Sequence, residues 1–232
     1  MPIQILSSQR LYQQAAEQIA ALIQKGEYPV GAKLPAERDL ARQLGVSRPT
    51  VREALIALEI TGLVEVRIGS GAVVKQKSPA NGVRPSPDMG LSPFDVVAAR
   101  RLIEPQVASL AAISITSEEL ADLNAVTDMM KPFGNGDRPN LDADRLFHRR
   151  IAEATHNSVV VDLIDRIWEG MFGQIFSALS ARTDTSYDQM MTYGDHKRIV
   201  HCIERRDAAG AGAMMLAHLV NVEMKLLHVD DR

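Results

Sequence analysis

The chain has 232 residues, of which 24% are charged, and a formal net charge of −3 at neutral pH. This length suffices for two domains with separate cores. A single cysteine, Cys202, excludes an internal disulfide and is typical of a reducing compartment. Aromatic residues make up only 4% of the chain, which argues against stacking on single-stranded nucleic acid as the main activity. The first residues lack the apolar segment of a secretory signal, and no apolar run approaches the roughly 18 residues of a membrane span. We therefore expect a cytoplasmic protein without a membrane partner.

The net charge is unevenly distributed along the chain. Residues 1–77 hold 10 Lys/Arg against 7 Asp/Glu, a balance of +3, whereas residues 78–232 hold 16 against 22, a balance of −6. Contacts with phosphate need only a local positive patch. The charge distribution therefore favours nucleic-acid binding by the N-terminal part and another role for the acidic remainder.

Residues 34–58 predict two short helices that meet at Gly45. Each of them has one apolar stripe at helical spacing. Glycine suits the tight turn between two crossing helices, and the hydroxyl of Ser47 can cap the second helix. The pattern is typical of a helix-turn-helix.

The second of these helices begins with basic and polar residues. Its candidate DNA-contacting residues are Ser47 at its start and Arg48, Thr50 and Arg52 in or beside its first turn, the part of a recognition helix that meets DNA. A solvated helical hairpin without a binding role would show the same apolar spacing, so this alternative stays open. A hairpin signal directly after the helices favours DNA binding.

That hairpin signal spans residues 62–74. Residues 62–67 alternate like a strand, the glycine-rich segment 68–71 predicts a turn, and residues 72–74 return. Glycines at such a tip allow backbone N–H groups to approach phosphate or the minor groove. We expect a winged helix-turn-helix domain over residues 1–77.

A polar segment with several prolines, residues 78–92, predicts an extended linker. Ser92 and Pro93 mark the start of a helix, and from there the chain has helical signals only. A capping box at residues 116–119 opens a second helix. The chain is predicted to be mainly α, with an all-helical antiparallel bundle over residues 93–232. Its further helices are expected at about 141–155, 158–181, 187–206 and 208–228.

The bundle contains a candidate metal site. Asp144 and His148 are four residues apart on one helix and so share a face, while His196 and His218 belong to two later helices. One carboxylate and three imidazoles suit a divalent transition metal such as Zn²⁺, Ni²⁺, Mn²⁺ or Fe²⁺. By spacing alone, an exposed Asp–His pair and separately satisfied histidines explain the pattern equally well.

Two residues are candidates for binding a small ligand beside that site. Arg100, on the first bundle helix, can pair with a carboxylate through its guanidinium. A surface salt bridge in the pair Arg100-Arg101 is the alternative. Asn157 is a further candidate for a polar contact with the ligand or a metal-binding histidine.

Residues 10–74 resemble the winged-helix domain of GntR-family transcription regulators, through the motif LPAERxLAxxLGVSRxTVREAL. The resemblance implies that Gly69 stands at the wing tip. Family members near the fatty-acid regulator often have His before that glycine. This chain has Ile68 there, so it departs from the pattern of a wing that reads bases. The resemblance also implies contacts with operator bases or phosphates by Arg38, Arg48, Thr50 and Arg52.

The acidic half resembles the FCD effector domain of the FadR-type branch of this family. Its metal-binding members show an Asp-x-x-x-His, a His in a later D/E-H-x-x-I/L segment and a His before Leu near the C-terminus. An Arg commonly stands in that family where Arg100 does, although the Glu two residues earlier is replaced here by Ala98. Segments such as GDHKRIVHCI are most similar to repressors of hexuronate utilisation. The resemblance implies a metal held by Asp144, His148, His196 and His218.

These observations predict a homodimeric DNA-binding repressor. Two winged helices would sit on a palindromic double-stranded operator, and a sugar acid of the hexuronate class, or another small carboxylate, would bind at the metal and lower operator affinity. One alternative is a regulator of the same family that binds its effector without metal. Another is a metalloenzyme, although no Glu stands beside the ligands as a general base and an enzyme has no use for the helix-turn-helix.

Overall fold

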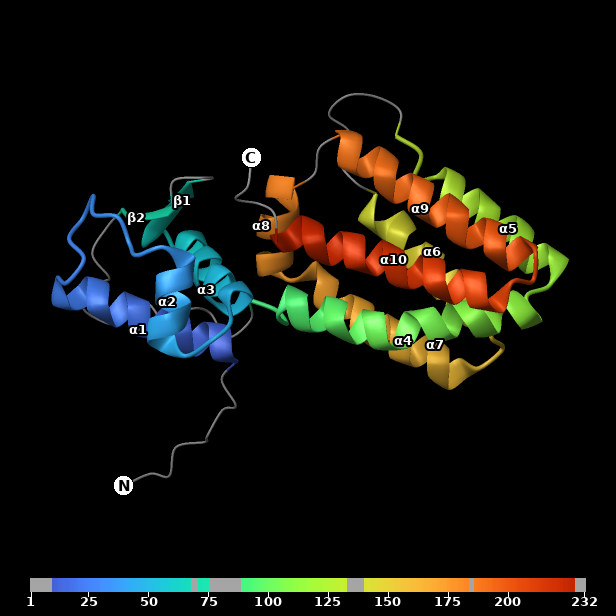
Figure 1. Ribbon diagram of the computed structural model, residues 1–232, viewed down its shortest axis with the longest axis horizontal. Helices are drawn as coiled ribbons and strands as arrows, with labels where there is room; N and C mark the ends of the chain where they lie inside the picture. The colour runs from blue at the N-terminus through green and yellow to red at the C-terminus, as the bar shows by residue number, and fades with distance from the viewer. Residues whose placement is uncertain (1–9, 68–70, 76–88, 133–139, 184–185, 228–232) are drawn as a thin grey trace, which may run out of the picture. The chain divides into compact units, whose positions relative to one another are not determined.

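The described part of the chain is mostly helical and comprises residues 10–67, 71–75, 89–132, 140–183 and 186–227 in the computed structural model (Figure 1). The chain divides into two units, and the division falls between Ser92 and Pro93. Within the described residues, no helix is both long enough and apolar enough to cross a membrane.

The first unit is a winged helix-turn-helix. It consists of α1 (Leu11–Lys25), α2 (Glu37–Leu44), α3 (Arg48–Ile60) and the antiparallel strands β1 (Val64–Arg67) and β2 (Gly71–Val74). Both α1 and α2 pack against α3, and β1 follows α3 closely. The predicted pair of helices and the two-stranded wing are confirmed.

The turn between α2 and α3 has the predicted geometry. Gly45 has a φ of +68°, in the left-handed region that glycine adopts without strain, and its N–H donates to the carbonyl of Ala41. Ser47 caps α3, because its Oγ accepts a hydrogen bond from the N–H of Thr50 at 3.3 Å. These two residues set the direction in which α3 leaves the turn.

The end of the predicted linker belongs to the first unit. Met89 is buried, and the carbonyl of Gly90 accepts a hydrogen bond from the hydroxyl of Tyr12 at 3.0 Å. Ser92 donates through Oγ to the buried carboxylate of Glu53 on α3 at 2.5 Å. The polar composition of the segment gave no sign of this anchor, because the anchor consists of only one apolar side chain and two hydrogen bonds.

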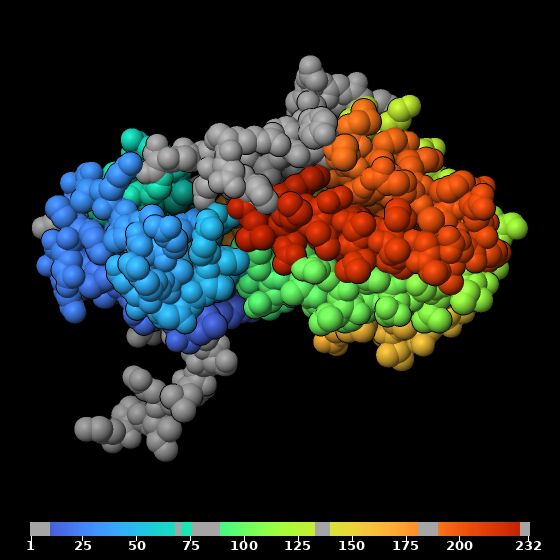
Figure 2. Space-filling model, viewed as in Figure 1, coloured from blue at the N-terminus to red at the C-terminus, as the bar shows by residue number. Residues whose placement is uncertain are grey.

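The second unit contains only helices among its described residues. Helix α10 runs alongside α4 and also packs on α9, as the ribbon and the space-filling view show (Figures 1 and 2). The predicted helical bundle is confirmed. Its helices are α4 (Pro93–Ser114), α5 (Ser117–Asp128), α6 (Leu141–Glu153), α7 (Ser158–Glu169), the 3-10 helix η1 (Gly170–Phe172), α8 (Gln174–Thr183), α9 (Ser186–Glu204) and α10 (Ala208–Leu227).

The long helix predicted over residues 158–181 is wrong. Helix α7 ends at Glu169, a single 3-10 turn follows, and α8 starts only at Gln174. Gly170 and Gly173 flank the break, and Gly173 is extended with ψ of 157°. Glycine is a poor helix former, so two glycines three positions apart interrupt an apolar face that is otherwise continuous.

A glycine allows α10 to approach α4 closely. A Cβ at Gly212 would lie 2.4 Å from Oγ of Ser109 and 3.0 Å from the carbonyl oxygen of Pro105, both on α4. Because α4 carries Arg100 and α10 carries His218, this close approach also sets the distance between two of the predicted site residues.

We expect Gly212→Ala to lower the free energy of unfolding by about 1–3 kcal/mol, because the new methyl overpacks the α4–α10 contact. Gly194→Ala in α9 is the matched control. A Cβ there meets only Nη1 of Arg198, at 4.0 Å, so the helix gains about 0.5–1 kcal/mol. Urea unfolding of both variants measures the difference in their free energies of unfolding. Equal stabilisation in both would show that the α4–α10 contact accommodates a methyl group without strain.

Candidate metal centre and nucleic-acid interface

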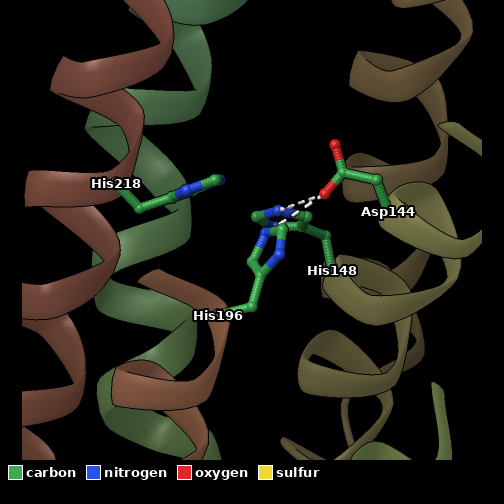
Figure 3. A group of neighbouring side chains, drawn as sticks. All are labelled: Asp144, His148, His196 and His218. Atoms are coloured by element: carbon green, nitrogen blue, oxygen red, sulfur yellow. Dashed lines mark ion pairs between the residues drawn. The ribbon is translucent and has the colours of Figure 1, made fainter. Parts of the chain in front are cut away.

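The four predicted metal ligands converge in the interior of the second unit. Asp144 and His148 lie one turn apart on α6, His196 comes from α9 and His218 from α10 (Figure 3). One ligand atom of each lies within 4.8 Å of the others. The dashed lines in Figure 3 join one carboxylate oxygen of Asp144 to His148 Nε2, at 3.5 Å, and to His196 Nε2, at 3.2 Å.

The donor atoms of this cluster fit a metal ion. Oδ1 of Asp144 and both ring nitrogens of His196 and of His218 are buried, and none has a hydrogen-bond partner in the described residues. Leaving so many polar atoms unsatisfied costs about 1–3 kcal/mol each, so a bound cation would remove a large penalty. Ligand atoms that share one ion at about 2.1 Å lie roughly 3–4 Å apart, which small side-chain adjustments reach from this arrangement. The Asp144 side chain keeps 22% exposure, which leaves the cluster one side open to solvent.

The electrostatics hold most of the cluster in its metal-binding protonation state. Burial alone would raise the pKa of Asp144, but attraction to the neighbouring rings of His148 and His196 holds it well below its usual value. Burial lowers the pKa of His196, and burial together with repulsion from His196 lowers the pKa of His218 to about 3. The carboxylate is therefore anionic and these two rings are neutral at neutral pH, as metal ligands must be.

Two buried carboxylates, absent from the predicted site, lie behind the histidines. Oε2 of Glu104 lies 2.6 Å from Nδ1 of His148, and Oδ2 of Asp195 lies 3.8 Å from Nδ1 of His218. A carboxylate at the far nitrogen fixes the tautomer and orientation of a metal-binding imidazole. Burial raises the pKa of Glu104, but Arg100 and His148 outweigh it and lower that pKa to about 2. Burial likewise lowers the pKa of His148, and attraction to Glu104 outweighs it and raises that pKa.

Arg100 is part of the same buried network. Its side chain is 1% exposed, so the alternative of a surface salt bridge is wrong. Nε donates to Oε1 of Glu104 at 2.7 Å, and Nη2 lies 3.1 Å from Nε2 of His148. The guanidinium carbon stands 4.2 Å from the ring centre of Trp168, a cation–π contact. The next residue, Arg101, is the half-exposed member of the pair and bonds Glu223.

Asn157 lies apart from these buried side chains. It is exposed, and its Oδ1 caps α7 by accepting a hydrogen bond from the N–H of Val159 at 3.0 Å. His156, before it, is exposed and lies 3.0 Å from a carboxylate oxygen of Glu119. The structure thus gives Asn157 a capping role at the end of a helix.

Four of the predicted DNA-contacting residues are exposed or half-buried, on α2 and at the start of α3. Arg38 on α2 is exposed, as are Ser47 and Arg48 at the start of α3, and Thr50 is half-buried in the first turn. Arg48 keeps 63% of its side chain exposed, with only a long 3.9 Å approach to Glu37. These residues form a basic and polar face at the N-terminus of the recognition helix. Gly69, at the predicted wing tip, lies outside the described residues.

Known proteins match both units. Residues 11–74 match the family model of bacterial regulatory proteins of the gntR family, and residues 95–221 match the FCD domain. The chain is 37% identical to the Uxu operon transcriptional regulator of Escherichia coli (strain K12), covering 97% of this chain and 91% of that protein. It is 32% identical to the Exu regulon transcriptional regulator of the same strain, covering 97% and 88%.

The chain is a GntR-family regulator with an FCD domain. One solved structure, of Lar, which controls expression of the Listeria monocytogenes agr system, covers 96% of this chain and 99% of that one with a TM-score of 0.50 and 18% identity. That similarity shows the fold alone. The family membership shows that this is a ligand-responsive DNA-binding transcription regulator and not an enzyme, so the metalloenzyme alternative is wrong.

In this GntR-family regulator, Arg52 differs from the expectation of an exposed DNA contact. It is 5% exposed, and its Nε and Nη2 bond the two carboxylate oxygens of Glu37 at 3.1 and 2.9 Å. The bidentate pair joins α2 to α3 across the turn. Glu37 and Arg52 are fifteen residues apart, so only the folded helix pair reveals the contact.

We expect Glu104→Gln to weaken metal binding by about 10- to 100-fold, because the amide can no longer accept the Nδ1 proton of His148 as a charged partner. Glu223→Gln is the control, since Glu223 bonds Arg101 and touches none of the four ligands. Competition with a chromophoric chelator measures both affinities. Equal affinities in the two variants would show that Glu104 does not orient His148.

Proposed function

We propose that this regulator is a repressor that leaves its operator when a sugar acid, of the hexuronate class, binds at a divalent metal in the FCD domain. The observation that carries the proposal is the cluster of Asp144 with three buried histidines, whose unsatisfied donor atoms lie beside the buried Arg100. The regulators named Uxu and Exu, at 37% and 32% identity, support the choice of hexuronates.

The charge of the site explains why a carboxylate effector would need the ion. Asp144, Glu104 and Asp195 bring three negative charges, Arg100 and the Arg198 that pairs with Asp195 bring two positive charges, and with neutral rings the formal charge is −1. A buried anionic site repels a carboxylate, and the acidic second half of the chain does not attract one. A divalent ion would supply two positive charges and coordination positions for carboxylate and hydroxyl oxygens. Arg100 is suited to bind the same carboxylate with an N–H group.

In the proposed function, the exposed face at the start of α3 binds DNA. Arg48 can reach base edges, while Arg38 and Thr50 can contact bases or the phosphate backbone. Arg52 contributes indirectly, since its ion pair with Glu37 fixes α2 against α3. The choice of metal among Zn²⁺, Ni²⁺, Mn²⁺ and Fe²⁺ is left open by a donor set of one oxygen and three nitrogens.

Exposed apolar side chains on the second unit support a homodimer. Helices α4 and α7 pack against each other, and both expose large apolar residues to solvent. Such exposure on neighbouring helices is typical of a surface that a second subunit covers. A two-fold dimer would place two winged helices on a palindromic operator. The exposed residues are Leu102, Leu110 and Ile113 on α4 and Val159 and Leu163 on α7.

We expect Arg48→Ala to weaken operator binding by about 1–3 kcal/mol, roughly 5- to 150-fold, through the loss of one base contact. Arg149→Ala removes the same charge from the second unit, where Arg149 pairs with Glu153, and should leave the affinity unchanged. Fluorescence anisotropy with a labelled palindromic duplex measures both variants and the stoichiometry, expected at two chains per duplex. Equal losses in both variants, or one chain per duplex, would contradict the assignment.

We expect D-glucuronate or D-galacturonate to lower the operator affinity of metal-loaded protein by about 5- to 150-fold, the usual range of allosteric coupling. His196→Ala should abolish the response, because His196 is one of the buried ligands. His201→Ala, an exposed histidine on the same helix, should respond like the unmodified protein. Release that persists in His196→Ala after chelation would favour the metal-free regulator.

A further inference from the structure

Nε2 of His148 has two possible partners that exclude each other, the Arg100 side chain and a metal ion. Nδ1 of His148 lies 2.6 Å from the Glu104 carboxylate, and Nε2 lies 3.1 Å from Nη2 of Arg100, a group that can only donate, so the proton of the neutral ring belongs on Nδ1. A neutral imidazole then offers a single lone pair, on Nε2. That nitrogen faces Asp144 at 3.5 Å and lies 3.1 Å from Nη2 of Arg100. The lone pair can accept an Arg100 hydrogen bond or bind a metal ion, but it cannot do both.

The Arg100 side chain has little freedom to withdraw. Its Nε is bonded to Glu104 at 2.7 Å, its guanidinium stacks on Trp168 at 4.2 Å, and the residue is 1% exposed. When Nε2 of His148 is taken by a cation, one N–H of Nη2 keeps its long 3.4 Å contact with Oε2 of Glu104, and the other stays buried and loses its acceptor. A buried N–H without an acceptor is unfavourable, so the group then favours any ligand that presents an anionic oxygen.

We propose that Arg100 makes the effector response conditional on the metal. Arg100 competes with the metal for Nε2 of His148, and a bound metal transfers the Nη2 hydrogen bond from His148 to the carboxylate of the effector. Metal and carboxylate therefore bind cooperatively, and by linkage each raises the affinity of the other by the same factor. This inference rests on the proposed function, because it names how that same site is controlled.

If Arg100 competes with the metal, replacing Arg100 should raise the affinity for Zn²⁺, whereas a purely supporting role predicts a lower affinity. Replacing Arg100 removes both a competitor for Nε2 and a neighbouring positive charge, so Zn²⁺ alone should bind Arg100→Gln about tenfold more tightly or better. A residue that only stabilises the site would weaken Zn²⁺ binding when removed. Arg100→Lys separates the two causes, because Lys keeps the charge but lacks the planar fork that reaches Glu104 and His148 together.

The experiment is calorimetric titration of full-length protein with Zn²⁺ alone and then with D-glucuronate. Arg101→Gln is the matched control, because it is the next residue on α4 and bonds Glu223 outside the cluster. Because Arg100 stacks on Trp168, the tryptophan fluorescence changes in the Arg100 variants for that reason alone, so cooperative thermal unfolding followed by circular dichroism reports that each variant is folded. We expect tighter Zn²⁺ binding in Arg100→Gln and in Arg100→Lys than in Arg101→Gln. We also expect glucuronate binding that requires Zn²⁺ in the unmodified protein and is lost in Arg100→Gln.

Each arm of the titration decides a separate statement. An Arg100→Lys variant that binds Zn²⁺ no more tightly than Arg101→Gln overturns the competition, whatever the effector, because a gain confined to Arg100→Gln would come from the lost charge. Glucuronate affinity that is the same with and without Zn²⁺ overturns the coupling. Failure of every hexuronate to bind the Zn²⁺-loaded, unmodified protein is instead a failure of the proposed function, and the Zn²⁺ arm still tests the competition at His148.

Discussion

The buried ion pair between Arg100 and Glu104 is the interaction on which the site in the second unit depends. Both side chains are almost fully buried, where an unpaired charge is strongly destabilising. Arg100 and His148 together keep Glu104 ionised, and Glu104 holds the His148 ring with Nε2 toward Asp144. One pair of residues, a single turn apart on α4, thus sets the chemistry of a ligand on α6.

The sequence was most informative where the determinants are local. The turn at Gly45 and the cap at Ser47 each depend on a few neighbouring residues, and both are present as expected. Asp144 and His148 were recognisable for the same reason, since a spacing of four residues defines one face of a helix. His196 and His218 were candidates by residue type alone, and the family resemblance strengthened their assignment to the same site, because no spacing rule joins residues from three helices.

The features that the sequence did not reveal are contacts between distant segments. Nothing local links Glu104 to His148, 44 residues later, or Glu37 to Arg52 across the helix-turn-helix. The helix break after α7 was missed for another reason, because its apolar face continues past Gly170 while the backbone does not. From the sequence alone, a charged residue is expected to be exposed. In this protein Arg52, Arg100 and Glu104 are nevertheless buried, because each has a partner of opposite charge.

The position of Arg100 on α4 bears on how the two functions of the chain are connected. Ser92 is anchored to Glu53 on the recognition helix, and Pro93 begins α4. Arg100 follows eight residues after Ser92, a rise of about 12 Å or roughly two helical turns. The hydrogen bond that ties Ser92 to α3 therefore lies, along the chain, about two helical turns before Arg100. In the proposed function, release of DNA requires only that the effector bind more tightly to the state with the lower operator affinity.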